Sequence, residues 1–430
     1  MSGENRMRNC KTVSLALLLA FVHLSAAAQM SNASGHWVSA WSTAVHTPRS
    51  APGAPQQAAF ENQTIRMVER MTLAGDRLRV RFSNEFGTTP LTIGSAHIAV
   101  VKENGAIVPE TDRVLKFGGT ASVNIPAGAP MLSDPVDLKF PAFAEVAISI
   151  FLPKQTAPST FHLLGQHDTY ISEAGDFTSA AQIANAKTTK SWYFLGGIDI
   201  WAPTQAGPVV AFGDSITDGF GARAQYGDWP NQLADRLAES KVTASLAVDN
   251  EGIGGNRILH DGAGVAALAR FDRDVLSQPG VKDLILLEGI NDIGWPDMKP
   301  RKAPDGSMRE NPFAHERVSS DDMIQGMKQM IDRAHEHGIR VFGATMTPYE
   351  GANVFTDEGE ATRQAVNQWI RTGGAFDGVF DFDAAVRDPA RQSKFREDLQ
   401  TCDYLHPNAA GYKAMAAVID LKMLEVSTKK

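Results

Sequence analysis

Short apolar runs alternate with amphipathic stretches through the second half of the chain, and this alternation constrains the fold more than any other feature. The apolar runs predict strands at residues 209–212, 245–248, 284–287, 341–346 and 379–382. The amphipathic stretches predict helices at residues 229–239, 321–337, 361–371 and from 409 to about 426. Strands that alternate with helices indicate a parallel sheet with helices on both faces, where ligands bind at the carboxyl ends of the strands.

The first half of the chain has a different pattern. Leu78, Val80 and Phe82 alternate with three arginines, and residues 146–150 show the same period of two, which is typical of half-buried strands. Turns that contain glycine or proline separate these runs, and helical periodicity is rare. We therefore expect an antiparallel, jelly-roll-like β-sandwich over residues 29–205. A short linker at residues 201–208 then leads into the α/β domain, which we place at residues 206–430.

The first 28 residues are typical of a secretory signal peptide. Arg6, Arg8 and Lys11 precede an apolar run over residues 13–22, and three alanines follow at residues 26–28. The run is too short for a membrane span, which needs about 20 residues. We expect this segment to be removed, so that the mature protein is secreted or periplasmic and has no membrane span.

The composition excludes several classes of protein. A hydrophobic fraction of 43% over 430 residues is sufficient for large packed cores and excludes disorder as the main state. The 41 basic and 49 acidic residues give a net charge of -8, which provides no field to attract nucleic acid or anionic lipid. Only two cysteines occur, and one lies in the predicted signal peptide, so no internal disulfide is expected. The composition does not predict an oligomeric state.

A serine stands where the first predicted strand of the α/β domain ends. Residues 211–219 read AFGDSITDG, which places Ser215 at the carboxyl edge of that strand. Such a serine either belongs to a turn or helix cap or acts as a nucleophile. A serine hydroxyl is a good nucleophile only when a histidine removes its proton and a carboxylate orients that histidine.

Asp403 and His406 are the candidates for these two groups. They precede the last predicted helix, and a three-residue spacing in a turn lets a carboxylate reach an imidazole. The same spacing recurs at Asp332 and His335, but these residues fall inside a predicted helix and are expected to form a solvated pair. We favour Asp403 and His406 because the loops at the edge of an α/β sheet expose functional groups.

Two further strand ends offer donors for a negatively charged oxygen. Residues 249–257 read DNEGIGGNR, and the glycines Gly254 and Gly255 let a backbone N–H approach a substrate closely. Residues 289–292 read GIND, in which the side-chain amide of Asn291 is a second donor. Each block alone is also consistent with an ordinary turn. All of them, however, fall at strand ends on one edge of one sheet.

Together these blocks resemble the SGNH, or GDSL-type, esterase/lipase superfamily from about residue 208 to the carboxyl end. The resemblance implies a flavodoxin-like three-layer fold and ester hydrolysis, with Ser215 as nucleophile, His406 as general base and then acid, and Asp403 orienting His406. It also implies an oxyanion hole formed by the amides of Ser215 and Gly255 and the side chain of Asn291, with Gly254 as the alternative glycine. No metal and no cofactor are implied. Residues 262–267 match a dinucleotide fingerprint only formally, because no strand directly precedes them.

The first half resembles the region that precedes the hydrolase domain in a secreted bacterial subgroup of this superfamily, which is associated with plant-polysaccharide breakdown. Residues 37–42 (WVSAWS) and 82–87 (FSNEFG) carry this resemblance. The favoured partner is therefore a small-molecule or polysaccharide ester, with acetylated plant polysaccharide or oligosaccharide as substrate. The first domain either binds carbohydrate or forms one wall of the cleft.

Two other functions remain open at this point. One is a lipase or lysophospholipase of the same superfamily, and the other is a non-catalytic carbohydrate-binding protein. Residues 291–321 are rich in Pro, Lys and Arg and are expected to form an insertion that borders the cleft. Within it, Trp295 either lines an acyl or sugar pocket or packs in the core.

Overall fold

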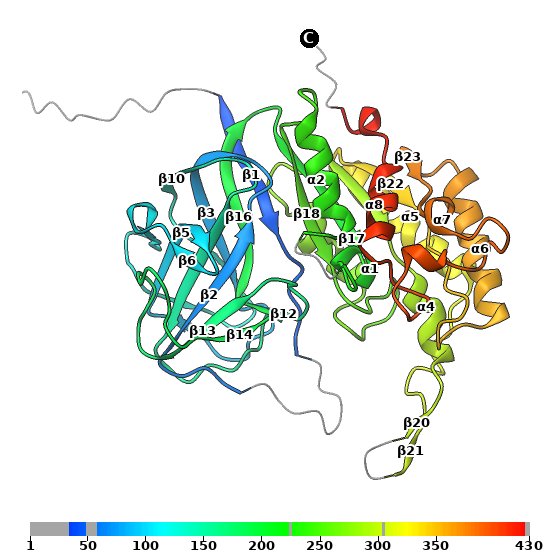
Figure 1. The fold of residues 1–430 in the computed structure, drawn as a ribbon, viewed down its shortest axis with the longest axis horizontal. Helices are drawn as coiled ribbons and strands as arrows, with labels where there is room; N and C mark the ends of the chain where they lie inside the picture. Colours follow the sequence, from blue (N-terminus) through cyan, green and yellow to red (C-terminus); the bar gives the residue numbers. More distant parts are fainter. Residues whose placement is uncertain (1–33, 49–57, 223–225, 303–305, 426–430) are drawn as a thin grey trace, which may run out of the picture. The chain divides into compact units, whose positions relative to one another are not determined.

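The second half of the chain contains a five-stranded parallel sheet (Figure 1). The computed structural model describes residues 34–48, 58–222, 226–302 and 306–425, and the predicted signal peptide lies outside them. The strands follow in the order β18 (Leu246–Gly252), β17 (Gly207–Gly213), β19 (Asp283–Leu287), β22 (Arg340–Ala344) and β23 (Gly378–Phe380), and all neighbours are parallel. Along the chain this order is 2-1-3-4-5, a doubly wound arrangement that confirms the predicted α/β sheet.

Helices cover both faces of this sheet. One face carries α2 (Trp229–Glu239) and α8 (Ala409–Ala417), and the other carries α5 (Ser320–Glu336) and α6 (Asp357–Thr372). Strand β17 shows the reason, because side chains alternate between the faces of a strand. Val209 packs in the core that contains Trp229 of α2, whereas Val210 packs in the core that contains Met323 of α5.

Shorter elements complete this α/β region, which we define as residues 207–425. The helices are α1 (Ser215–Asp218), α3 (Ala267–Phe271), α4 (Ile290–Gly294) and α7 (Phe382–Val386). Single turns occur at η2 (Asp272–Leu276), η3 (Trp295–Asp297), η4 (Glu397–Leu399) and η5 (Leu421–Leu424), and a small hairpin pairs β20 (Arg301–Lys302) with β21 (Met308–Arg309).

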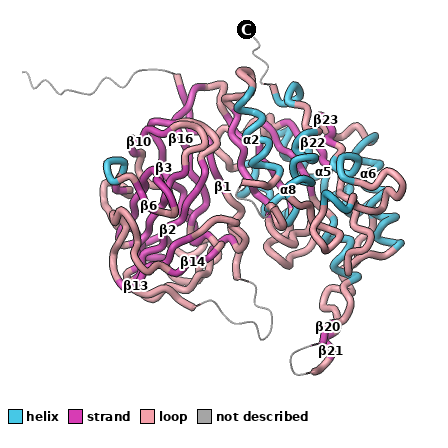
Figure 2. The backbone as a smooth tube through the Cα atoms, viewed as in Figure 1, coloured by secondary structure: helices cyan, strands magenta, loops and turns pink. Residues whose placement is uncertain are grey.

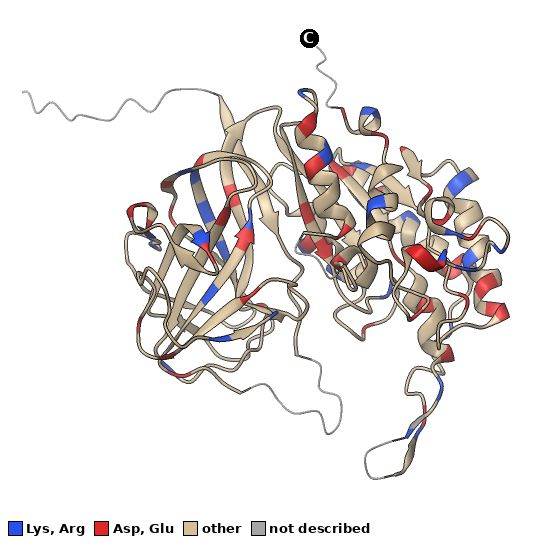
Figure 3. Ribbon diagram, in the orientation of Figure 1, with Lys and Arg blue, Asp and Glu red and all other residues tan. Residues whose placement is uncertain are grey.

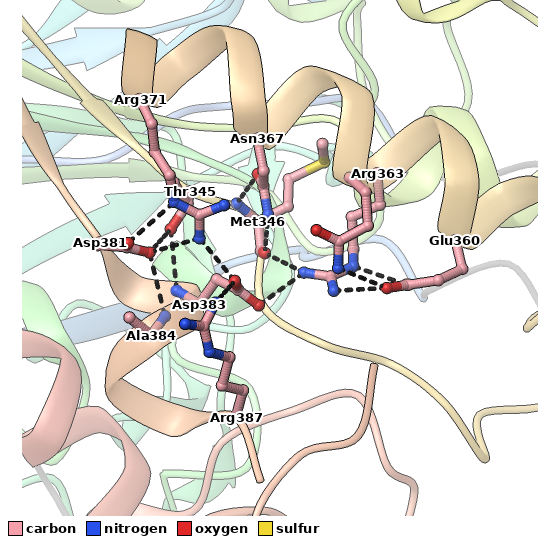
Figure 4. A network of polar contacts seen from close by, with 11 residues as sticks. Thr345, Met346, Glu360, Arg363, Asn367, Arg371, Asp381, Asp383, Ala384 and Arg387 are labelled. Carbon is pink, nitrogen blue, oxygen red and sulfur yellow. Dashed lines mark hydrogen bonds and ion pairs between the residues drawn. The ribbon is translucent and has the colours of Figure 1, made fainter. Parts of the chain in front are cut away.

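A buried ion-pair network joins β22, α6 and α7 (Figure 4). Arg363 of α6 is fully buried and donates to Asp383 at 2.8 Å and to the carbonyl of Met346 at 2.8 Å. Arg371 and Arg387 reach the other oxygen of Asp383 at 2.6 and 2.9 Å. A buried charge requires such partners. The network therefore fixes α6 and α7 against the end of β22.

The first half is an antiparallel β region, which we define as residues 35–203 (Figure 2). One sheet contains β1 (Gly35–Ser42), β16 (Leu195–Pro203), β3 (Gly75–Ser83), β10 (Val136–Phe140) and β9 (Pro130–Leu132). A second contains β14 (Lys187–Thr189), β13 (Thr169–Ala174), β2 (Gln63–Arg70), β11 (Glu145–Leu152), β5 (Ser95–Glu103), β6 (Ala106–Ile107) and β7 (Arg113–Val114). Two short pairs are β4 (Leu91–Ile93) with β8 (Val123–Ile125) and β12 (Phe161–His162) with β15 (Trp192–Tyr193).

Strand β11 differs from the half-buried strand expected at residues 146–150. Ala147 and Ser149 are buried, as are the apolar residues between which they alternate. The reason is that Ala147 packs in a second, smaller cluster with Val68, Ala99 and Ile107. Strand β3 follows the prediction, because Leu78, Val80 and Phe82 are fully buried and the arginines between them are partly exposed.

The last helix and the linker are shorter than predicted. Helix α8 ends at Ala417, where Val418 and Ile419 follow and Asp420 accepts a hydrogen bond from the N–H of Lys422 to begin η5. The predicted end near residue 426 lies outside the described residues. Residues 201–203 belong to β16 and residues 207–208 to β17, so only 204–206 connect the two sheets.

The β region and the α/β region are joined by direct hydrogen bonds. The N–H of Ser39 donates to the carbonyl of Pro279 at 2.9 Å, and the hydroxyl of Ser42 donates to Glu251. Thr43 forms a parallel β-bridge with Asn250 of β18. The described residues from Gly35 onward accordingly form one compact unit. Within the described ranges, no helix has both the length and the apolar character needed to cross a membrane.

Candidate active site

Ser215 is the first residue of α1, and Asp214 alone separates it from the end of β17. Asp214 caps α1 by accepting a hydrogen bond from the N–H of Ile216 at 2.9 Å, which sets the turn on which Ser215 stands. The side chain of Ser215 is hydrogen bonded to Nε2 of His406 at 2.8 Å, and the residue retains 8% of its exposure. The structure thus places a serine hydroxyl and an imidazole in contact across 191 residues of sequence.

Asp403 holds the other side of this imidazole. Its Oδ2 lies 2.6 Å from Nδ1 of His406. Its Oδ1 accepts hydrogen bonds from the backbone N–H groups of Leu405 and His406, both at 3.0 Å, and from the hydroxyl of Thr401 at 2.6 Å. Burial raises the pKa of Asp403, but these hydrogen bonds outweigh burial and hold it well below its usual range. A charged Asp403 requires the proton on Nδ1, so Nε2 accepts from Ser215.

The second Asp-x-x-His pattern does not form the expected pair. His335 lies in α5, and its Nε2 contacts Asp377 at 2.8 Å rather than Asp332. Asp377 precedes β23 and also accepts a hydrogen bond from the N–H of Val341. His335 therefore belongs to the amino-terminal edge of the sheet, at the opposite ends of the strands from Ser215.

The structure distinguishes the two glycines of the turn after β18. The N–H of Gly254 donates to Oδ2 of Asp218 at 2.9 Å. The N–H of Gly255 has no acceptor among the described residues, and neither has the backbone N–H of Ser215. Gly255 also has a φ of 79°, in the left-handed region that favours glycine. Of the two glycines, Gly255 is the one whose donor remains available.

Asn291 is oriented by two hydrogen bonds. Its amide Nδ2 donates to the carbonyl of Asn256 at 2.9 Å, and its Oδ1 accepts from the indole N–H of Trp295 at 3.1 Å. An indole only donates, so the positions of the amide oxygen and nitrogen are unambiguous. One N–H of Nδ2 is then left for another acceptor. Trp295 is half-buried and supports Asn291, a role that neither sequence-based interpretation of this tryptophan included.

Arg270 joins the strand ends that carry these groups, although no sequence motif marked it. It is fully buried and donates to the carbonyl of Gly213 at the end of β17 (3.0 Å) and to the carbonyl of Glu251 in β18 (2.8 Å). It also donates to Asn256 and Asp274, at 2.8 and 2.9 Å. A buried guanidinium with these partners fixes the distance between the Ser215 turn and the glycine turn.

Buried carboxylates lie behind the serine turn, and Figure 3 marks acidic segments at the ends of β17 and β18. Burial raises the pKa of Asp214 to about 7 and that of Asp292 to about 6. Burial, with the nearby Asp214 and Asp292, also raises the pKa of Glu288 well above its usual range. Its cationic neighbour Arg270 is 3.6 Å away and directs its hydrogen bonds elsewhere, so it offsets only part of this rise.

The raised pKa of Glu288 predicts how stability depends on pH. Because its pKa is raised in the folded state, this group's contribution to stability is complete below the unfolded pKa and is lost as pH rises toward the folded value. We expect E288Q to remove that loss. The unfolding free energy of E288Q relative to wild type should therefore increase between pH 5.5 and 8.5, by at most about 1.4 kcal/mol per pH unit. Urea unfolding of wild type and E288Q at both pH values measures this increase.

E336Q is the matched control, because Glu336 is exposed at the end of α5. Its difference from wild type should not change with pH. A constant difference for E288Q as well would show that Glu288 is ionised in the folded protein.

In the described part of the chain, no group of three or more His, Cys, Asp or Glu side chains is placed to hold a metal ion. Cys402 is exposed beside Asp403.

One known family matches the second half of the chain. Residues 211–414 match the model of the GDSL-like Lipase/Acylhydrolase family. The α/β region is therefore a GDSL-like acylhydrolase domain, as the sequence blocks predicted. The chain that carries it is an ester hydrolase. A search of curated proteins finds no match.

Several solved structures are similar to about half of the chain. A carbohydrate acetylesterase from Sinorhizobium meliloti is 15% identical, with a TM-score of 0.37 and coverage of 50% of this chain and 98% of that chain. A variant of an acetyl-xylooligosaccharide esterase from Geobacillus is 21% identical, with a TM-score of 0.37 and coverage of 52% and 96%. A GDSL-like lipase from Bacteroides thetaiotaomicron is 19% identical, with a TM-score of 0.34 and coverage of 50% and 87%.

Proposed function

We propose that this protein is a secreted serine esterase that hydrolyses short-chain, chiefly acetyl, esters of plant polysaccharides or oligosaccharides through an acyl-Ser215 intermediate. The observation that carries the proposal is the hydrogen-bonded series from Ser215 to His406 (2.8 Å) and from His406 to Asp403 (2.6 Å). This is the arrangement in which a neutral imidazole removes the proton of a serine while a carboxylate stabilises the resulting imidazolium. The signal peptide predicted at residues 1–28 supports secretion.

The residues of the site act in turn in the proposed reaction. Nε2 of His406 takes the hydroxyl proton as Ser215 Oγ attacks the ester carbonyl carbon. The N–H groups of Ser215, Gly255 and Asn291 stabilise the negative charge that develops on the carbonyl oxygen. His406 then gives its proton to the leaving alcohol oxygen, and the acyl group remains on Ser215. A water that loses a proton to His406 attacks this acyl-enzyme and releases the carboxylic acid and the free serine.

A polar cavity beside His406 supports a hydroxyl-rich alcohol. The cavity has a volume of about 480 Å³ and is lined by side chains of the β region and by Phe220, whose ring centre lies 4.5 Å from that of His406. The lining from the β region includes Asn104, Gln166, Asp168, Tyr170 and Lys190. Amide and carboxylate groups with an aromatic ring suit a sugar better than a fatty acyl chain. The β region, which we propose to be a jelly-roll-like sandwich, thereby forms one wall of the cleft.

The substrate class is tested by comparing two kinds of ester. We expect wild-type protein to hydrolyse p-nitrophenyl acetate faster than the butyrate and decanoate esters and to release acetate from acetylated xylan. Y170A should raise KM for acetylated xylooligosaccharide about tenfold, the equivalent of about 1.4 kcal/mol of lost contact. It should leave kcat/KM for p-nitrophenyl acetate unchanged, because p-nitrophenol lacks the hydroxyl groups that these polar side chains would bind. Steady-state kinetics on both substrates measure the difference.

W201A is the control, because Trp201 is a part-exposed aromatic residue of the β region outside the cavity. This substitution should alter neither the KM for acetylated xylooligosaccharide nor the kcat/KM for p-nitrophenyl acetate. A preference for decanoate would favour the lipase function, and saccharide binding without Ser215-dependent turnover of any ester would contradict the esterase.

A further inference from the structure

A histidine of the β region is linked to the glycine turn of the active site through one carboxylate. His162 ends β12, and its Nε2 lies 3.1 Å from Oδ1 of Asp218, the last residue of α1. The other oxygen of Asp218 accepts the N–H of Gly254 at 2.9 Å. Both side chains of the His162–Asp218 pair are almost fully buried, with 3% and 4% of their surface exposed. The Asp218–Gly254 hydrogen bond thus joins the helix that begins at the proposed nucleophile Ser215 to the turn that contains the proposed donor Gly255.

The hydrogen-bond partners of His162 favour a doubly protonated ring. Nδ1 faces the carbonyl oxygen of Ala44 at 2.8 Å, and Nε2 faces the carboxylate of Asp218. Both partners are acceptors, whereas a neutral imidazole carries only one N–H. Burial and the nearby Arg270 lower the pKa of His162, but Asp218 and Ala44 outweigh them and raise it. When the ring of His162 carries both protons, its contact with Asp218 is charge-assisted, which makes it stronger than a neutral hydrogen bond.

Asp218 has a definite geometric task in this arrangement. It is part of the helix that follows Ser215, and it holds the turn that contains Gly255 by accepting the amide of Gly254. Leu164, two residues after His162, lies against the same turn, since a Cβ on Gly254 would be 3.3 Å from its Cδ1. The β region therefore acts on the turn indirectly, through the contact of His162 with Asp218, and directly, through the packing of Leu164.

We propose that His162 is a positioning residue for the oxyanion hole, which fixes Asp218 and through it the Gly254–Gly255 turn relative to Ser215. This proposal rests on the proposed function, because it assumes that Gly255 donates to the oxyanion. It makes the β region a structural part of the catalytic centre rather than an appended module. A misplaced donor affects the transition state more than the bound substrate, since the negative charge exists only in the former.

The test compares H162L, H162Q and D218N. With p-nitrophenyl acetate, H162L and D218N should lower kcat about 10- to 100-fold, as expected for a displaced reacting group, with KM within about twofold of wild type. The affinity of phenylboronic acid, which forms a tetrahedral adduct with an active serine, should fall by the same factor as kcat/KM. H162Q retains an amide donor toward Asp218 and should recover part of the loss.

H97L is the matched control. His97 also pairs with an aspartate in the β region, Asp112 at 2.9 Å, but has no contact with the glycine turn. It should lower neither kcat nor boronate affinity. A readout independent of activity is amide hydrogen exchange of the peptide that spans residues 252–257. Exchange there should be faster in H162L than in wild type and unchanged in H97L and S215A.

The outcomes separate the two proposals. Unchanged kcat and unchanged exchange in H162L and D218N would overturn the positioning role, and so would a change in KM alone. Wild-type protein without Ser215-dependent hydrolysis would overturn the proposed function, while the exchange rates would still report whether His162 holds the turn. Should H162L fail to fold, D218N, which keeps a polar group at the contact, provides the same comparison.

Discussion

We expect S215A to lose ester hydrolysis by a factor on the order of 10⁴ to 10⁶ in kcat, as removal of a nucleophile does in enzymes of this type. The reason is that Ser215 is the hydroxyl in contact with His406, at 2.8 Å, so that its loss leaves no group to form the acyl-enzyme. The remaining activity would come from water activated by His406 and from the oxyanion donors. Steady-state hydrolysis of p-nitrophenyl acetate measures the loss, and a fluorophosphonate reagent should label wild type but not S215A.

S133A is the matched control for this substitution. Ser133 is buried in the β region, where its hydroxyl accepts from the N–H of Val80 and donates to the carbonyl of Asp134. It should cost stability but not activity. Thermal unfolding of S215A close to that of wild type would show that the loss is chemical. Activity of S215A within tenfold of wild type would rule out Ser215 as the nucleophile.

The second large effect is expected at Asn291. N291A should lower kcat about 10²- to 10³-fold with little change in KM, the usual cost of removing one oxyanion donor. Hydrogen bonds with Asn256 and Trp295 hold the side-chain amide of Asn291 in one orientation, so the direction of its remaining N–H is fixed before substrate binds. Such preorganisation is what makes a donor effective in a water-poor site. Kinetics on p-nitrophenyl acetate and on acetylated xylan should show the same factor, because the carbonyl oxygen is common to both.

N311A is the control for this prediction. Asn311 donates from its Nδ2 to the carbonyls of Trp295 and Pro296, at 2.8 and 2.9 Å, so it holds the backbone of the segment whose indole holds Asn291. It should alter stability and leave kcat nearly unchanged. An equal loss in N311A and N291A would show that the effect comes from displacement of Trp295 and not from a lost oxyanion donor.

The sequence was most informative where structure is local. The strand and helix alternation confirmed as a parallel sheet depends on periodicities of a few residues, and the blocks at Ser215, Asn291 and His406 are each contiguous. Two of the errors have different causes. The end of α8 is local, because Asp420 caps the next turn, whereas the burial of β11 is tertiary, because residues distant in the sequence cover its second face. The domain boundaries, the signal peptide and the roles of the site residues remain predictions.

The sequence by itself determined the class of this protein: the arrangement of strands and helices, and the motif blocks that mark an ester hydrolase. Only the tertiary structure decided the relations between groups that are distant in the chain. It distinguished Gly254 from Gly255 through a hydrogen bond to Asp218, gave Trp295 its task beside Asn291, and brought His162 to Asp218 across 56 residues. The physical reason is that backbone periodicity depends on near neighbours, whereas the partner of a buried polar group depends on which surfaces the fold brings together.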